Sequence, residues 1–196
     1  MTGGRNGFGA KLANIFSTKF VIETADSKAN KCYKQVFKNN MGSKEEPEIT
    51  SNPSKLNFTC ITFYPDLKKF KMHSMDSDTV SLLTKRAYDL AGVSDSKVKV
   101  MLNGQRIEIK NFVDYCDLYL NNKENMDLPK IIEKKTDRWE IIASLSDGQF
   151  QQVSFVNSIC TSKGGTHVNY ITDQIVSKLQ AAIQKKNKKL VIKPHQ

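Results

Sequence analysis

The chain has 196 residues, 39% of them hydrophobic and 26% charged, and a formal net charge of +10. This length allows one large domain or two small ones, and the composition is that of an ordinary globular protein. No apolar run reaches the roughly 18 residues that a membrane span needs, no secretory signal opens the chain, and the four cysteines form no CxxC pair, which argues against zinc and for reduced thiols.

The first half of the chain is predicted to begin with a glycine loop and a short helix, followed by a β-rich region. Four glycines fall within residues 2–9, and apolar residues at helical spacing follow in 11–18. The predicted strands are 20–24 and 32–37, joined as a hairpin by a turn at 26–30, and 58–63. Residues 39–54, rich in Gly, Ser, Glu, Pro and Asn, are predicted to form a variable loop.

A helix over 78–91 is predicted next. Asp76 or Ser77 can cap its start, and Gly92 is expected to stop it. Asn103-Gly104 between two β-rich runs predicts a hairpin over 98–109.

The second half is predicted to begin with a helix or helix–strand junction at 112–120, followed by a polar linker at 121–129. Strands are predicted at 139–145 and 151–159, with a turn at Asp147-Gly148. After a Gly-Gly loop at 161–166, a long amphipathic helix is predicted over 168–186, ended by the lysine run 185–189. Both chain ends look cut, because the glycine loop has no preceding strand and a strand-like run closes the chain. The chain is therefore expected to be a piece of a longer protein.

Positive charge is concentrated at the C-terminal end. Residues 161–196 hold seven lysines and one aspartate, a net +6, and the first 160 residues carry the remaining +4. A basic end of this kind indicates a phosphate-rich partner, most simply nucleic acid. The alternative is that lysines at a helix C-terminus complement the helix dipole and keep the end hydrated.

The glycine loop holds the residues best suited to ligand chemistry. Glycines let backbone N–H groups approach a ligand closely, and the helix that follows adds unpaired N–H groups and a positive dipole end. Together they predict an anion cradle suited to a triphosphate, with Lys11 and Arg5 as added cations. The alternative is a glycine-rich turn before a helix, with Lys11 in solvent, and spacing alone does not separate the two.

Two familiar glycine motifs are excluded. A Walker A loop ends in Gly-Lys-Ser/Thr, but here Ala10 separates Gly9 from Lys11, and Leu12 stands where the hydroxyl residue belongs. A dinucleotide fingerprint that begins at Gly7 and Gly9 would also need a glycine at the position of Leu12.

The segment GGRNGFGAKLANIFSTKF resembles the ATP-lid motif of the type IIA DNA topoisomerases, a branch of the GHKL ATPases, in which the usual text is GRNGYGAKL. Three further matches to the same family follow in the same order: DLKKFKM with KRAYDLAG, then VKVMLNG, then FQQVSFVNSICTSKGGTHV. The last is typical of the transducer domain. The resemblance covers nearly the whole chain and favours the eukaryotic nuclear form.

The resemblance implies an α+β fold and two domains. Residues 1–115 would be the C-terminal part of a GHKL (Bergerat) ATPase α/β sandwich, and 116–196 the start of a ribosomal-protein-S5-like transducer, with the predicted strands 139–145 and 151–159 in one sheet backed by the long helix. Because such a piece lacks part of its sheet, an exposed sheet edge is expected.

The resemblance also implies the residues that bind ATP. They are Gly4, Arg5, Asn6, Gly7, Phe8, Gly9, Ala10 and Lys11. Backbone amides of Asn6, Gly7, Gly9 and Ala10 would surround the phosphates, and Lys11 would pair with the terminal ones. Phe8 replaces the usual tyrosine, so this position keeps the ring and has no hydroxyl to offer the nucleotide.

The family's catalytic residues are not expected in this chain. Its Mg²⁺-binding asparagine and water-activating glutamate lie upstream of the glycine loop, and a lysine that reaches the γ-phosphate lies downstream. No catalytic residue and no metal ligand is therefore assigned here, and the chain alone is not expected to hydrolyse ATP. The acids Glu23, Asp26, Glu45 and Asp66 are interpreted as solvated surface residues.

The implied function is that of an ATP-dependent type II topoisomerase, a nuclear homodimer that passes one DNA duplex through a break in another. Lys185, Lys186 and Lys188 would contact the phosphates of double-stranded DNA without sequence preference. Two alternatives are another GHKL ATPase, of the mismatch-repair or chaperone type, and a basic nucleic-acid-binding module without a nucleotide site. The mismatch-repair and chaperone types do not share FVNSICTSKGGTHV.

Overall fold

The computed structural model describes residues 6–121, 128–136, 138–146, 148–190 and 192–193, and the chain divides into two compact units at Val80/Ser81. The division falls inside a helix and reflects contacts within the chain. The predicted domain boundary after residue 115 stays a prediction. Of the helices in the described ranges, none has both the length and the apolar character that crossing a bilayer requires.

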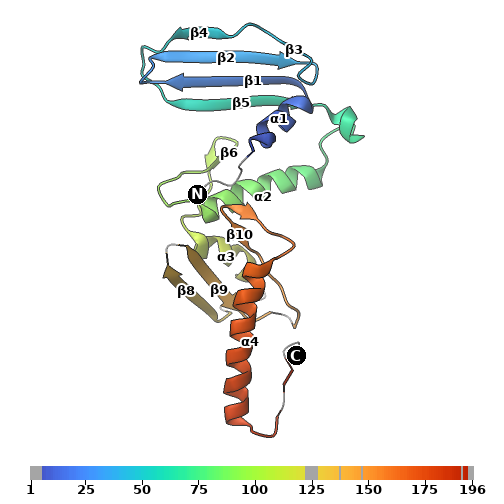
Figure 1. The fold of residues 1–196 in the computed structure, drawn as a ribbon, viewed down its shortest axis with the longest axis vertical. Helices are drawn as coiled ribbons and strands as arrows, with labels where there is room; N and C mark the ends of the chain where they lie inside the picture. Colours follow the sequence, from blue (N-terminus) through green and yellow to red (C-terminus); the bar gives the residue numbers. More distant parts are fainter. Residues whose placement is uncertain (1–5, 122–127, 137, 147, 191, 194–196) are drawn as a thin grey trace. The chain divides into compact units, whose positions relative to one another are not determined.

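The first unit is an antiparallel sheet preceded by a short helix (Figure 1). Strands β2 and β1 form a long hairpin, β5 pairs with the other side of β1, and the short strands β3 and β4 both pair with β2. The elements are α1 (Phe8–Ile15), β1 (Ser17–Asp26), β2 (Lys31–Lys38), β3 (Ser43–Lys44), β4 (Glu48–Ser51), β5 (Phe58–Pro65) and the 3₁₀ helix η1 (Leu67–Phe70).

Burial in this sheet is centred on β1. Phe20, Val21 and Ala25 are buried, and Phe20 packs edge-on against its cross-strand partner Phe37. Strand β5 is mostly exposed, Phe58 and Phe63 included, and in the described part of the chain it pairs only with β1. This matches the expected exposed sheet edge.

The predicted strands 20–24, 32–37 and 58–63 and the hairpin between the first two are confirmed. The prediction that 39–54 is all loop was wrong in part, since β3 and β4 lie within it. These strands have weak local β signals and form because β2 offers a free edge for pairing. Helix α1 starts three residues earlier than predicted, so Gly9 and Ala10 belong to its first turn.

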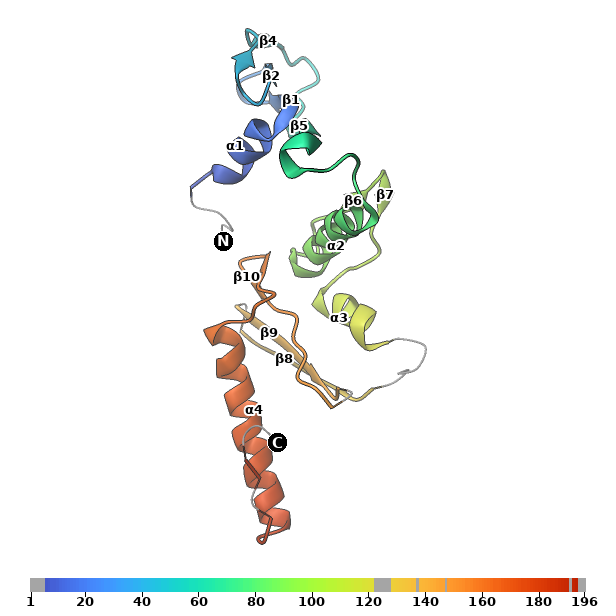
Figure 2. The ribbon, with the colours of Figure 1, turned by 90° about the vertical axis from the view of Figure 1, so that its right-hand side faces the viewer.

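In its described residues, the second unit contains three helices and three strand pairs. Figure 2 shows the hairpin of β8 and β9 and the long helix α4. The elements are α2 (Ser77–Val93), whose first residues belong to the first unit, β6 (Met101–Leu102), β7 (Gln105–Arg106), α3 (Phe112–Leu120), β8 (Lys130–Thr136), β9 (Trp139–Ser144), β10 (Phe155–Val156), β11 (Ile159–Cys160) and α4 (Thr166–Lys186).

Helices α2, α3 and α4, the hairpin at Asn103-Gly104 and strand β9 confirm their predictions. Asp76 caps α2 by accepting from the Thr79 N–H at 2.7 Å. Asp147 of the predicted 147–148 turn lies outside the described residues, as do residues 122–127 of the predicted linker at 121–129.

Three predictions in this unit were wrong. Gly92 does not stop α2, which continues to Val93. The strand predicted over 151–159 is instead a small hairpin of β10 and β11, because Asn157 and Ser158 adopt positive φ and turn the chain back. The expected pairing of 139–145 with 151–159 does not occur, since β9 pairs with β8, a strand that was not predicted.

The cysteines are free thiols, as predicted. Burial, followed by the nearby Asp117 carboxylate, raises the pKa of Cys116 to about 12. Cys116 is therefore a protonated, unreactive thiol at neutral pH.

Candidate functional site

The predicted nucleotide-binding residues lie at the start of α1. Gly4 and Arg5 fall outside the described residues, and Asn6 through Lys11 are all exposed. Phe8 is the first residue of α1 and is 61% exposed. The structure therefore brings six of the eight predicted residues together on one open loop and helix turn.

The N-terminus of α1 is suited to an anion. Gly7 is its N-cap, in the left-handed region at φ 67°, no side chain caps the helix, and its first turn holds no acid. The first N–H groups of a helix have no intrahelical acceptor, and the dipole adds a partial positive charge there. A capping side-chain oxygen or a carboxylate would compete with an anion for these N–H groups, and α1 has neither in its first turn.

The two glycines of this turn differ in what they require. Gly7 needs its positive φ, which a residue with a Cβ adopts only with strain. Gly9 has no positive φ, and a Cβ added there would have no atom within 4 Å in the described structure. Gly9 therefore leaves an open space beside the helix N-terminus, which a bound phosphate could approach.

Lys11 is exposed, and it forms no ion pair with any of the described acids. Its side chain belongs to the same helix turn as the free amides. An ammonium group here can bind a terminal phosphate as a mobile point charge.

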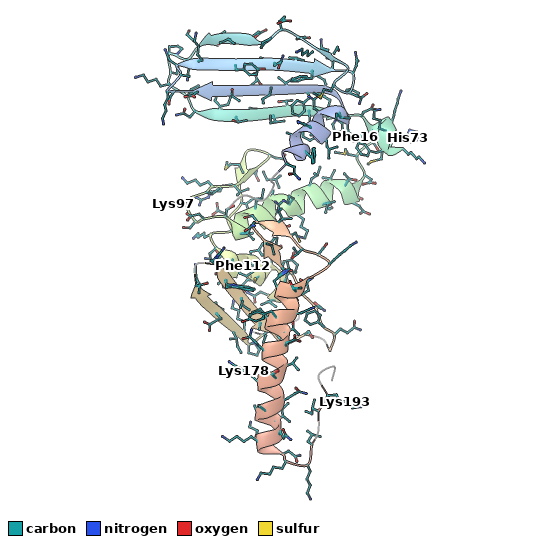
Figure 3. The ribbon with its side chains drawn as sticks, in the orientation of Figure 1. Phe16, His73, Lys97, Phe112, Lys178 and Lys193 are labelled. Carbon is teal, nitrogen blue, oxygen red and sulfur yellow. The ribbon has the colours of Figure 1, made fainter. Side chains whose placement is uncertain are left out.

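The helix is held in place from its C-terminal end. Ser17, buried at the start of β1, donates to the Ala13 carbonyl at 2.5 Å, and the Asp66 N–H donates to the Phe16 carbonyl at 2.8 Å. The Phe16 ring, labelled in Figure 3, lies 5.2 Å from that of Phe70. One end of α1 is thus anchored on the sheet while its N-terminal turn is left open.

The four acids of the first unit that were interpreted as surface residues make local contacts. Glu23 pairs with Lys34 at 3.2 Å, Asp66 accepts from Asn40 at 3.1 Å, and Asp26 accepts from turn amides. Glu45 pairs with Lys38, and this hydrogen bond lowers the pKa of Glu45.

No described group of three His, Cys, Asp or Glu residues could hold a metal ion. Among the described residues, the Mg²⁺ that the family resemblance implies therefore has no such cluster of His, Cys, Asp or Glu to bind it.

The predicted DNA-binding lysines gather at the far end of α4. Lys185 and Lys186 form its last turn, Asn187 is the C-cap, and Lys188 follows; all four are exposed. The chain then returns along α4, where Gln180 donates to the Ile192 carbonyl at 2.7 Å. The lysines therefore occupy a tip that is open to solvent. Figure 3 labels Lys178, earlier on α4, and Lys193, on the segment that follows the tip.

Sequence reasoning assigned no role to His167, yet the structure gives it partners. Its Nε2 lies 3.1 Å from Thr161 Oγ1 and 3.4 Å from Ser154 Oγ, and these two hydroxyls are 2.6 Å apart. A second group, built around Asp89 and Tyr115, was also missed. Only the spacing of Lys85 and Asp89, four residues apart on a predicted helix, gave a signal for it.

Comparison with known proteins places this geometry in a family. The family model described as DNA gyrase B matches residues 111–195. DNA topoisomerase 2 of Arabidopsis thaliana is 58% identical over 198 residues, covering 99% of this chain and 13% of that protein. DNA topoisomerase 2-alpha of Homo sapiens is 51% identical over 200 residues, covering 100% of this chain and again 13% of the relative.

Solved structures also match nearly the whole chain. The ATPase region of Saccharomyces cerevisiae topoisomerase II has a TM-score of 0.88 at 46% identity, and the match covers 99% of this chain and 49% of that one. The ATPase and transducer domains of DNA topoisomerase II from Balamuthia mandrillaris have a TM-score of 0.89 at 39% identity, with the same coverage.

The chain thus spans about an eighth of the length of these relatives and about half of the solved chains. The match confirms the predicted α+β, GHKL-type fold. The rival assignments, another type of GHKL ATPase or a module without a nucleotide site, gain no support from it. The chain belongs to the DNA topoisomerase II family, and it corresponds to part of that family's ATPase and transducer region.

Proposed function

We propose that this chain works within an ATP-dependent type II DNA topoisomerase, where its first turn binds the phosphates of ATP and its second unit carries the effect of binding toward the DNA. The main support for this proposal is the N-terminus of α1. Gly7 is in the left-handed conformation, Gly9 has free space beside it, and the uncapped amides lie next to Lys11. The fit of this N-terminus to a triphosphate agrees with the 58% identity to a DNA topoisomerase 2.

The roles of the loop residues follow from their chemistry. Bound ATP supplies the phosphoanhydride bond whose hydrolysis drives the enzyme. Gly4 through Lys11 wrap the phosphates, and the amides of Asn6, Gly7, Gly9 and Ala10 donate to phosphate oxygens. Lys11 and Arg5 add positive charge, and Phe8 offers its ring without the hydroxyl of a tyrosine.

The rest of the proposal concerns the whole enzyme. ATP binding, with Mg²⁺ held by residues other than those described here, closes two copies of the N-terminal region into a homodimer that captures a DNA duplex. The captured duplex then passes through a transient break in a second duplex. The partners are therefore double-stranded DNA and a second copy of the enzyme, and the site of action is the nucleus.

A chimera tests this function. The 196 residues would replace the matching segment of Arabidopsis thaliana DNA topoisomerase 2, of which they cover 13%. We expect the chimera to relax supercoiled DNA only when ATP is present, with the unmodified Arabidopsis enzyme as the reference. A well-folded chimera that binds no ATP would refute the proposed role of the glycine loop.

The lysine tip of α4 gives a separate prediction. Replacing Lys185, Lys186 and Lys188 together by alanine in the chimera should leave ATPase activity without DNA unchanged and weaken its stimulation by DNA. The slope of log affinity against log salt should become shallower by about 0.9 for each DNA phosphate that the variant no longer neutralises. DNA-stimulated ATPase activity, measured from about 50 to 200 mM salt, checks this.

Lys178→Ala is the matched control, since Lys178 is exposed on the same helix two turns earlier. If the triple variant keeps full stimulation and the same salt slope, the lysines serve only to complement the helix dipole and hydrate the end of α4.

A further inference from the structure

Helices α2 and α3 meet at a polar cluster in the second unit, and the centre of this cluster is buried. The carboxylate of Asp89 accepts two hydrogen bonds from Lys85 Nζ, at 2.8 and 2.9 Å, and a third from the Tyr115 hydroxyl at 2.6 Å. Asp89 and Tyr115 are 3% and 1% exposed. The Tyr119 hydroxyl, 2.9 Å from that of Tyr115, completes the cluster.

The centre of the cluster, Asp89 with Tyr115, is closed to solvent, while Lys85 and Tyr119 reach the surface. Desolvation and then the hydrogen bond to Asp89 raise the pKa of Tyr115, so this hydroxyl stays protonated and continues to donate. Gly92, one turn beyond Asp89, lies directly under Tyr115, since a Cβ there would come within 2.5 Å of Tyr115 Cβ and Cγ. Helix α3 is thus seated on α2 by both a polar contact and a close packing contact.

Arg86, which follows Lys85 in α2, binds a different element, the hairpin of β10 and β11. Arg86 Nη1 donates to the Ser158 carbonyl at 2.9 Å, and Ser158 lies in the turn between β10 and β11. The Phe155 ring of β10 packs edge-on against Tyr115 with centroids 5.7 Å apart. Adjacent side chains of one helix therefore bind both α3 and the β10–β11 hairpin.

The hairpin in turn is tied to the start of α4. The Thr161 N–H donates to the Ser154 carbonyl at 2.8 Å, and Thr161 Oγ1 lies 3.1 Å from Nε2 of His167, in the first turn of α4. Helix α2 is thus hydrogen-bonded to the turn of the hairpin, and residues at the open end of the hairpin are hydrogen-bonded to α4. The other end of α4 carries the lysine tip.

We propose that Lys85, Arg86, Asp89 and Tyr115, named here the α2 junction, are positioning residues that couple ATP hydrolysis to DNA passage. This inference rests on the proposed function and extends it. A displacement of α2 moves the β10–β11 hairpin through Arg86 and moves α3 through Asp89, and the hairpin carries it to α4. None of the four belongs to the proposed nucleotide-binding residues or to the lysine tip, so their replacement uncouples the two activities and leaves ATP binding intact.

The test uses two variants in the chimera. Arg86→Ala removes the hydrogen bond to the Ser158 carbonyl, and Tyr115→Phe removes the hydrogen bonds to Asp89 and Tyr119. We expect ATPase activity without DNA to stay within about twofold of the unmodified chimera. The number of DNA passages per ATP hydrolysed should fall at least tenfold. Arg86→Lys, which keeps a donor, should restore part of the coupling.

Arg106→Ala is the matched control, because Arg106 is exposed on β7 of the same unit and its side chain forms no hydrogen bond or ion pair with the other described residues. Melting temperatures of all variants show whether they fold equally well. Unchanged passages per ATP in Arg86→Ala and Tyr115→Phe would overturn the inference while leaving the proposed function in place. A parallel loss of ATPase activity, passage and melting temperature would also overturn it, showing a merely structural role. An unmodified chimera that fails to relax DNA would overturn both proposals.

Discussion

Replacing Lys11 by alanine in the chimera should lower kcat/KM for ATP hydrolysis about a hundredfold. A hydrogen bond between charged groups contributes about 1.5–3 kcal/mol, and removing one preorganised donor from a charged transition state costs about 100-fold or more in rate. Lys11 is exposed on α1 and forms no ion pair with the described residues, so alanine removes little else. Steady-state ATPase kinetics measure the effect.

Gly9→Ala provides a second test of the same site. Alanine at this helical position meets no atom within 4 Å, and it favours the helix by about 1 kcal/mol over glycine. Any loss of ATP affinity in this variant therefore reports the close approach of a ligand and does not report damage to the fold.

Lys28→Ala, an exposed change in the β1–β2 turn, serves as the control and should keep normal kinetics. If Lys11→Ala and Gly9→Ala both bind and hydrolyse ATP as well as this control does, the start of α1 is an ordinary glycine-rich turn.

Gly92→Ala should destabilise the chain by about 1–3 kcal/mol, the usual cost of overpacking. Helix propensity alone predicts the opposite sign, because alanine is favoured over glycine inside a helix by about 1 kcal/mol. The packing term dominates because the new Cβ would lie 2.5 Å from Tyr115 Cβ and Cγ, on a ring that is buried and hydrogen-bonded. Tyr115 can therefore give way only by breaking its bond to Asp89.

Denaturant unfolding of the 196-residue chain checks this prediction, with Gly9→Ala as the matched substitution in a helix that has space for the methyl group. A Gly92→Ala variant as stable as Gly9→Ala would show that the two helices separate at little cost. The close packing of α3 on α2 would then contribute little to the free energy of unfolding.

Much of the fold was predictable where the local sequence and the final pairing agree. The Asn103-Gly104 turn and the long apolar stripe of α4 are local signals, and both elements formed as predicted. Strands β3 and β4 could not be predicted in this way, because their pairing with β2 decides their conformation. Gly92 misled for a related reason: glycine is the usual stop signal of a helix, and here it makes room for a residue distant in sequence.

The candidate sites also differ in whether a local sequence signal could predict them. The glycine loop is a contiguous motif, so its residues could be named from sequence, and the structure adds the left-handed Gly7 and the helix start at Phe8. In the α2 junction, Asp89 binds Tyr115 and Arg86 binds Ser158 of the neighbouring hairpin. The partners in each of these hydrogen bonds lie far apart along the chain. No contiguous sequence pattern predicts such a cluster, so it can be recognised only in the structure.

The outer side of β5 has a practical consequence for work with this chain. Alternate backbone N–H and C=O groups along that side point away from β1, and residues such as Phe58 and Phe63 expose their rings. Two copies meeting there can template one another through new interstrand hydrogen bonds. Self-association should therefore rise with protein concentration, and dilute samples are the suitable ones for every measurement made on the chain by itself.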